Sequence, residues 1–93
     1  MTPILKDPDA MLGYTIRWPD AVLDGAAIAN ASWSIEPDEA GAIVPSSDFI
    51  DGGETGARFS GGLAGRVYRA VCHIVLSDGR AADRSLVIRV EQR

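Results

Sequence analysis

Hydrophobic and polar side chains alternate with a period of two along several short segments of this chain. Between residues 11 and 18, every second position carries a large hydrophobic or aromatic side chain. This period predicts a strand with one buried face. Pro19 should end it, because proline has no amide hydrogen to continue a ladder. The same period at residues 55–60 and 85–90 predicts two further strands.

The segment from residue 67 to residue 76 differs, because nearly every position in it is hydrophobic. That pattern is expected of a central strand that is covered on both faces. Ser77, Asp78 and Gly79 follow it directly. Because glycine adopts positive φ angles without a steric penalty, these residues predict a tight hairpin turn that leads into the strand at residues 85–90.

The middle of the chain has a weaker pattern. Residues 21–31 are rich in alanine, but Gly25 lowers the helix propensity, so we expect a loop that leads into a strand. Farther along, Pro45 is expected to end a very short strand. The predicted strands are, in chain order, residues 11–18, 28–35, 42–44, 49–50, 55–60, 67–76 and 85–90.

The number and spacing of these segments predict the fold. About seven short strands at intervals near ten residues, without a convincing long helix, indicate an all-β, immunoglobulin-like β-sandwich of about seven antiparallel strands. A chain of 93 residues has room for one such domain. We expect residues 1–10 to form an extended N-terminal arm and residues 11–93 to form the sandwich.

Three residues make this interpretation more specific. Trp33 lies on a strand where such sandwiches often bury an indole, and Tyr68 begins the segment 67–76, where its hydroxyl can return to the upstream backbone. Cys72 shares a face with Tyr68. A carbohydrate-stacking platform with a reactive thiol is the alternative, but cysteine is among the most buried residue types. The predicted structural core contains Trp33, Tyr68, Cys72, Ile74, Leu86 and Ile88.

The residues needed for catalysis or metal binding do not occur in a suitable pattern. His73 is the sole histidine, and as a strand neighbour of Cys72 it should point to the opposite face. Asp48, Asp51 and Glu54 share one loop, but they lack the ligand spacing of a calcium-binding loop, so a solvated acidic turn is favoured. We therefore predict no catalytic residues, no cofactor and no metal, and hence no enzyme.

Charge and hydropathy exclude further classes. A net charge of −4, a pI near 4.7 and the absence of a basic stripe argue against nucleic acid as a partner. No apolar run reaches the roughly 20 residues that a membrane span needs. The chain has one cysteine, which excludes an intramolecular disulfide and fits synthesis in a reducing cytoplasm. The N-terminus lacks the basic and apolar regions of a signal peptide.

Several segments together resemble a family of small tailed-phage and prophage structural proteins, which are described as fiber-tail adaptor or virion-associated proteins. The resemblance spans nearly the whole chain in order, and it departs at residues 19–24 and 36–59. The segments that carry it are Lys6-Asp7-Pro8-Asp9-Ala10, Leu12-Gly13-Tyr14-Thr15-Ile16-Arg17-Trp18, Ile28-Ala29-Asn30-Ala31-Ser32-Trp33, Ser60-Gly61-Gly62-Leu63-Ala64-Gly65 before Tyr68, Asp78-Gly79-Arg80, and Asp83-Arg84-Ser85 before residues 86–90.

The resemblance implies a virion component that is made in the host cytoplasm and binds other phage proteins, in many copies on a symmetric ring. It implies no catalytic residues. Function is then expected at the arm, the loops and the strand edges, and the candidate partner-binding residues are Ile4, Leu5, Lys6, Asp7, Pro8 and Trp18. Trp18 could instead close the core. Two other hypotheses remain: a capsid decoration or glycan-binding adhesion module on the virion surface, and a small hydrolase or metal-dependent enzyme.

Overall fold

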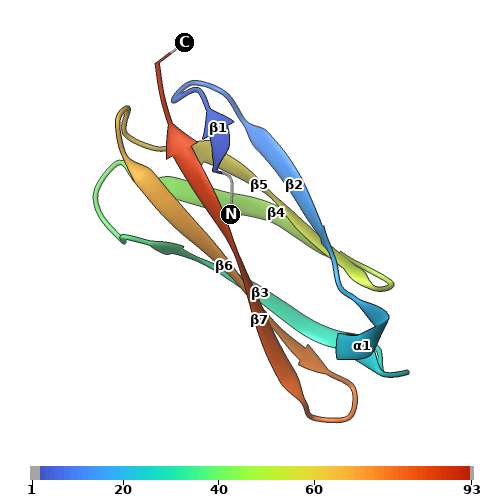
Figure 1. Cartoon of the computed structure of the whole chain (residues 1–93). Coiled ribbons are helices and arrows are strands. Elements are labelled where there is room, and N and C mark those ends of the chain that lie inside the picture. The colour runs from blue at the N-terminus through green and yellow to red at the C-terminus, as the bar shows by residue number, and fades with distance from the viewer. Residues whose placement is uncertain (1–2, 93) are drawn as a thin grey trace.

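The computed structural model describes residues 3–92 of the chain (Figure 1). Within these residues, strands and one short helix account for all the regular structure. They are β1 (Ile4–Lys6), β2 (Leu12–Arg17), α1 (Asp20–Leu23), β3 (Ile28–Glu36), β4 (Ile43–Asp51), β5 (Glu54–Gly61), β6 (Val67–Leu76) and β7 (Ala81–Val90). The all-β fold class is confirmed.

The strands form two sheets that pack face to face (Figure 1). One sheet has the order β1-β7-β6-β3, and the other has the order β2-β5-β4. All neighbours are antiparallel except β1 and β7, which run parallel. This arrangement is consistent with the predicted immunoglobulin-like sandwich, in which each sheet turns alternate side chains of its strands toward a shared core.

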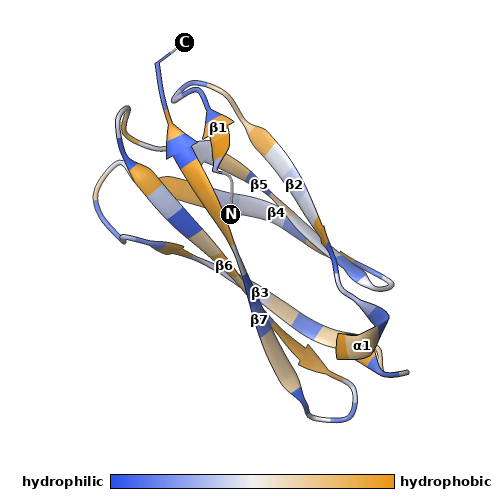
Figure 2. Cartoon of the chain, viewed as in Figure 1, coloured by the Kyte–Doolittle hydropathy of each residue, from blue (hydrophilic) through white to orange (hydrophobic). Residues whose placement is uncertain are grey.

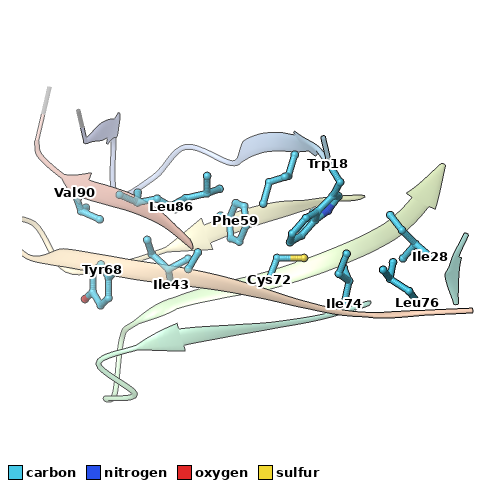
Figure 3. Close-up of a cluster of buried hydrophobic side chains, with 14 residues drawn as sticks. Trp18, Ile28, Ile43, Phe59, Tyr68, Cys72, Ile74, Leu76, Leu86 and Val90 are labelled. Carbon is cyan, nitrogen blue, oxygen red and sulfur yellow. The ribbon is translucent and has the colours of Figure 1, made fainter. Parts of the chain in front are cut away.

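The core lies between the sheets and follows from the period of two. On β5, Thr55, Ala57 and Phe59 are buried, and on β6 every second residue from Tyr68 to Leu76 is buried (Figure 3). Phe59 stands at the centre, where its ring meets the indole of Trp33 edge to face with ring centroids 5.3 Å apart. Both sheets therefore contribute to one hydrophobic cluster.

The N-terminal segment differs from the prediction of a separate arm. Residues Ile4–Lys6 form β1 and pair with Ile88–Val90 of β7, so this part of the segment belongs to the sandwich. Likewise, the alanine-rich segment begins with the short helix α1 instead of a loop. The turn of α1 starts after Pro19, whose fixed φ of −63° suits a helix start.

Pro45 does not end a strand. β4 continues through Pro45 to Asp51, so the two short strands predicted on either side of it are one strand. This is possible because β4 is an edge strand, where a missing amide hydrogen is tolerated. A bulge between Ser46 and Phe49, with Ser47 at a φ of 51°, interrupts its pairing with β5.

The strand β6 is central in its sheet, as predicted, but it is covered on one face only. The residues between its buried positions are half-buried or exposed, from Val67 to Val75. Figure 2 shows hydrophilic segments interrupting the hydrophobic ribbon of β6. The turn at Ser77, Asp78 and Gly79 joins β6 to β7 as predicted, with Gly79 at a φ of 90°.

Candidate interaction surfaces

The first predicted contact residues are mostly turned into the protein. Ile4 packs against the core cluster, Leu5 is exposed, and Lys6 is only 2% exposed. Asp7 and Pro8 are half-buried in a turn, where the Asp7 carboxylate accepts a hydrogen bond from the amide of Asp9 at 2.8 Å. Among these five, Leu5 is therefore the residue that offers a large apolar side chain to a partner.

Lys6 has a structural environment that is unusual for a lysine. Its Nζ donates hydrogen bonds to the carbonyl oxygen of Gly61 at 2.7 Å and to that of Asp7 at 2.8 Å. Burial lowers the pKa of Lys6, and the nearby carboxylates of Asp7 and Asp9 act in the opposite direction. The ammonium thus joins β1 to the end of β5, which gives Lys6 a structural role within the sandwich.

We expect Lys6→Ala to lower the free energy of unfolding by about 2 kcal/mol, because it removes a buried stem and leaves the Gly61 carbonyl without its donor. Urea denaturation followed by circular dichroism measures this loss. Leu5→Ala on the same strand is the matched control, and it should change stability by less than about 0.5 kcal/mol. Equal effects of the two substitutions would show that the buried ammonium does not hold β1 in place.

Trp18 is also buried, so it closes the core, as the alternative interpretation of this residue expects. Its Nε1 donates a hydrogen bond to Thr55 Oγ1 at 2.9 Å, and Thr55 Oγ1 lies 3.4 Å from Cys72 Sγ. Figure 3 shows the Trp18 indole and the Cys72 sulfur facing each other across the core. Burial raises the pKa of the Cys72 thiol, which keeps it protonated at neutral pH. A protonated, buried thiol is a poor nucleophile.

Tyr68 connects the core to the loop before β6. Its ring is fully buried, and its hydroxyl oxygen accepts a hydrogen bond from the amide of Leu63 at 3.0 Å. The same hydroxyl donates to Glu39 Oε1 at 3.3 Å. Ile74, Leu86 and Ile88 lie in the core cluster as well, whereas Trp33 is only half-buried and packs against it.

The remaining candidates for chemistry are separated in space. His73 is exposed on the outer face and pairs with the carboxylate of Asp83, on the opposite side of the sheet from Cys72. Among residues 3–92, no three His, Cys, Asp or Glu side chains lie together in a way that could hold a metal ion. No helix in this part of the chain is long and apolar enough to cross a membrane.

An apolar surface lies on the outside of the four-stranded sheet, where Leu5 and Val67 are exposed and further valines are half-buried. Leu5, Arg89 and Val67 form one row across three strands, since Leu5 and Val67 both pair with Arg89. Val87 occupies the next outward position of β7. We call this surface the valine face, and it contains Leu5, Val67, Val71, Val75 and Val87.

The charges on the valine face are paired with one another. Arg69 lies 3.7 Å from Glu36, and Arg89 lies 2.8 Å from Glu91. His73 and Asp83 form a third pair on this face. These exposed pairs contribute little stability, but they leave the face nearly neutral although the whole chain carries a net charge of −4.

The sequence contains a pattern of valines that corresponds to this face. The valines at positions 67, 71 and 75 are what make the segment 67–76 hydrophobic at nearly every position. Sequence reasoning attributed them to a strand buried on both faces within the domain. The structure instead leaves Val67 exposed and Val71 and Val75 half-buried on the outer face of the sheet.

These features define a class of protein: a small β-sandwich in which His73 and Cys72 point to opposite sides of one sheet and in which apolar side chains on the outside of that sheet are partly exposed. Residues 6–89 match the family model of the podophage GP4 fiber-tail adaptor protein gp77. The chain therefore belongs to this family of phage tail structural proteins, which confirms the resemblance seen in the sequence. Among curated proteins, none matches the chain.

Proposed function

We propose that this protein is an adaptor at the tail or head-tail region of the phage particle, where it docks fibers or connector proteins in several copies around a symmetric ring. The family match supports the place in the tail. The valine face is the observation that carries the docking role. A protein that works as an adaptor needs at least one surface that becomes buried on assembly, and exposed apolar patches mark such surfaces.

The size of the valine face fits a contact within a larger assembly. Four strands about 4.8 Å apart and about 33 Å long offer at most roughly 600 Å². Burying such a face against a partner removes at most about 1,200 Å² in total, which is the lower limit of a specific interface. One such contact is weak alone and becomes effective when several copies bind together.

The pairing of charges also supports docking through this face. Because Arg69 and Arg89 already have carboxylate partners, covering the face leaves no isolated charge to be desolvated. Leu5 and Val67 sit at one end of the face and are 45% and 53% exposed. They are the side chains on it that gain most from losing contact with water.

The test uses purified phage particles and mass spectrometry. Wild-type protein should be present in the particles, and Leu5→Glu combined with Val67→Glu should reduce its amount by roughly tenfold or more, since both apolar anchors are lost. Val44→Glu combined with Leu63→Glu is the matched control, because these residues are similarly exposed but lie outside the valine face. Circular dichroism verifies that each variant is folded.

Three results would contradict the proposal. Absence of the wild-type protein from particles would reject the adaptor role. Equal incorporation of both variant pairs would reject docking through the valine face. Immunogold label on the capsid faces, with none on the tail, would favour the capsid decoration or glycan-binding module instead.

A further inference from the structure

The two sheets of this protein have four outer strands, and three of them carry features that hinder pairing with another chain. β1 has only three residues. β2 has only six residues, and the carbonyl oxygen of its last residue, Arg17, accepts a hydrogen bond from Arg84 Nη1 at 3.4 Å. β4 contains Pro45 and a bulge. Short length, proline, bulges and charged side chains are the usual means by which natural proteins protect sheet edges.

The fourth outer strand, β3, lacks these protections. It has nine residues, contains no proline, and carries no charged side chain before Glu36. Its one irregularity is a bulge at the start, between Ile28 and Asn30, on the side that pairs with β6. A long, uncharged and regular outer strand is a template for pairing with another strand.

The backbone groups at this edge can be assigned. The Leu76 amide donates to the Arg80 carbonyl, so the even-numbered residues of β6 bond toward β7 and the odd-numbered residues bond toward β3. In the β3–β6 register, this alternation leaves the N–H and C=O groups of Ala31, Trp33 and Ile35 pointing out of the edge. The Ala31 amide accordingly donates to the side chain of its neighbour Asn30, at 2.9 Å, and not to β6.

A pocket also lies beside this edge. A pocket of about 240 Å³ opens between β3 and the bulge of β4, lined by Ala31, Ser32, Trp33, Pro45 and Asp48. The Trp33 indole N–H is buried, yet it has no hydrogen-bond partner among the residues that the structure describes. Buried donors are nearly always satisfied in complete structures.

From these observations we infer that β3 pairs antiparallel with β3 of a second copy of this chain, which joins the two four-stranded sheets into one continuous sheet. The pairing is centred on Trp33, so that Ala31 lies opposite Ile35 of the second copy. In this register, the outward groups of Ala31, Trp33 and Ile35 bond to the same groups of the second copy. The contact is isologous, as is usual for pairs of identical subunits.

We assign a second copy of this chain as the partner of β3 because the side chains of two β3 strands are compatible with each other in this register. Asn30 faces Glu36 of the second copy, which sets an amide donor against a carboxylate, and Ser32 faces Ser34. No like charges stand opposite each other, although each chain carries a net charge of −4. The small Ala31 side chain leaves room beside Ile35. The inference is independent of docking through the valine face.

The register can be tested by cross-linking two single-cysteine variants of the full chain. When Ser32→Cys and Ser34→Cys are mixed under mild oxidation, a disulfide should form between position 32 of one copy and position 34 of the other, because directly opposite residues lie close enough for a disulfide. Each variant alone should form at least about fivefold less dimer, since its cysteines are then diagonal and too far apart. Cys72 is fully buried and does not compete.

Ala31→Pro supplies an independent control. It removes an amide hydrogen that points out of the edge and is not used by β6, so the fold should persist while cross-linking in its background falls. Thr15→Cys, exposed on β2, should not form dimers when mixed with either cysteine variant. Leu5→Glu combined with Val67→Glu should leave cross-linking unchanged.

Three outcomes would overturn the inference. One is equal dimer formation by the mixture and by each single variant. Another is cross-linking that persists in folded Ala31→Pro protein. The third is a mixture that remains monomeric at millimolar concentration by sedimentation equilibrium and forms no disulfide.

Discussion

Replacing Phe59 with alanine should lower the free energy of unfolding by about 3–5 kcal/mol, as expected for a fully buried phenylalanine. Phe59 has no exposed surface and lies between the two sheets, in contact with the Trp33 indole. Its loss removes the ring from both sheets at once and leaves a cavity that the stiff strands close only in part. A domain of this size has a total stability of about 5–15 kcal/mol, so the variant should be near its unfolding limit.

Urea denaturation monitored by tryptophan fluorescence measures this effect, because Trp33 loses its neighbour when the ring is removed. Phe49→Ala is the matched control. Phe49 is 45% exposed on the outer side of the three-stranded sheet, so its removal should cost about 1 kcal/mol or less. If Phe59→Ala were no more harmful than Phe49→Ala, the ring would not be the central contact between the sheets.

Gly62→Ala should lower the free energy of unfolding by about 2–4 kcal/mol, for two reasons that add. Gly62 has a φ of 97°, a conformation that residues with a Cβ rarely adopt. A Cβ at this position would also lie 2.7 Å from Val90 Cγ2 and 3.0 Å from Ile43 Cγ1, both in the core. The substitution therefore strains the backbone and overfills the end of the sandwich.

Gly79→Ala separates these two causes. Gly79 has a similar φ of 90°, but a Cβ there would meet no atom within 4 Å, so its cost is limited to backbone strain of about 1–2 kcal/mol. Thermal unfolding of both variants measures the difference, which reports the overlap with Val90 and Ile43. Equal losses would mean that the core at Gly62 shifts to admit the methyl group.

Much of this fold could be predicted from the sequence because its strands obey local rules. Alternation on β5 correctly indicated that Thr55, Ala57 and Phe59 share a buried face. The Asp78-Gly79 turn fixed the neighbours β6 and β7, because a hairpin depends on adjacent residues alone. The hydroxyl of Tyr68 meets the backbone at Leu63, five residues upstream, which is again a local contact.

The features that escaped prediction depend on contacts between distant residues. Because lysine is charged, the sequence predicts that the Lys6 side chain is exposed. The pairing of β1 with β7 instead brings its ammonium to the Gly61 carbonyl. From the sequence alone, Pro45 predicts the end of a strand. The strand order shows that β4 lies at a sheet edge, where proline is tolerated within a strand. The valines of β6 suggested a strand covered on both faces, whereas Val67 is exposed and Val71 and Val75 are half-buried on the outer face.

The parallel pairing of β1 with β7 has a mechanical consequence. Tension that enters through the N-terminus and leaves through the C-terminus pulls these two neighbouring strands in opposite directions along their length. The hydrogen bonds between them, including that from the Glu91 amide to the Lys6 carbonyl, are then sheared together instead of being opened one at a time. Shearing several bonds at once needs more force than opening them in turn, so the β1–β7 pair is a mechanically resistant element of this fold.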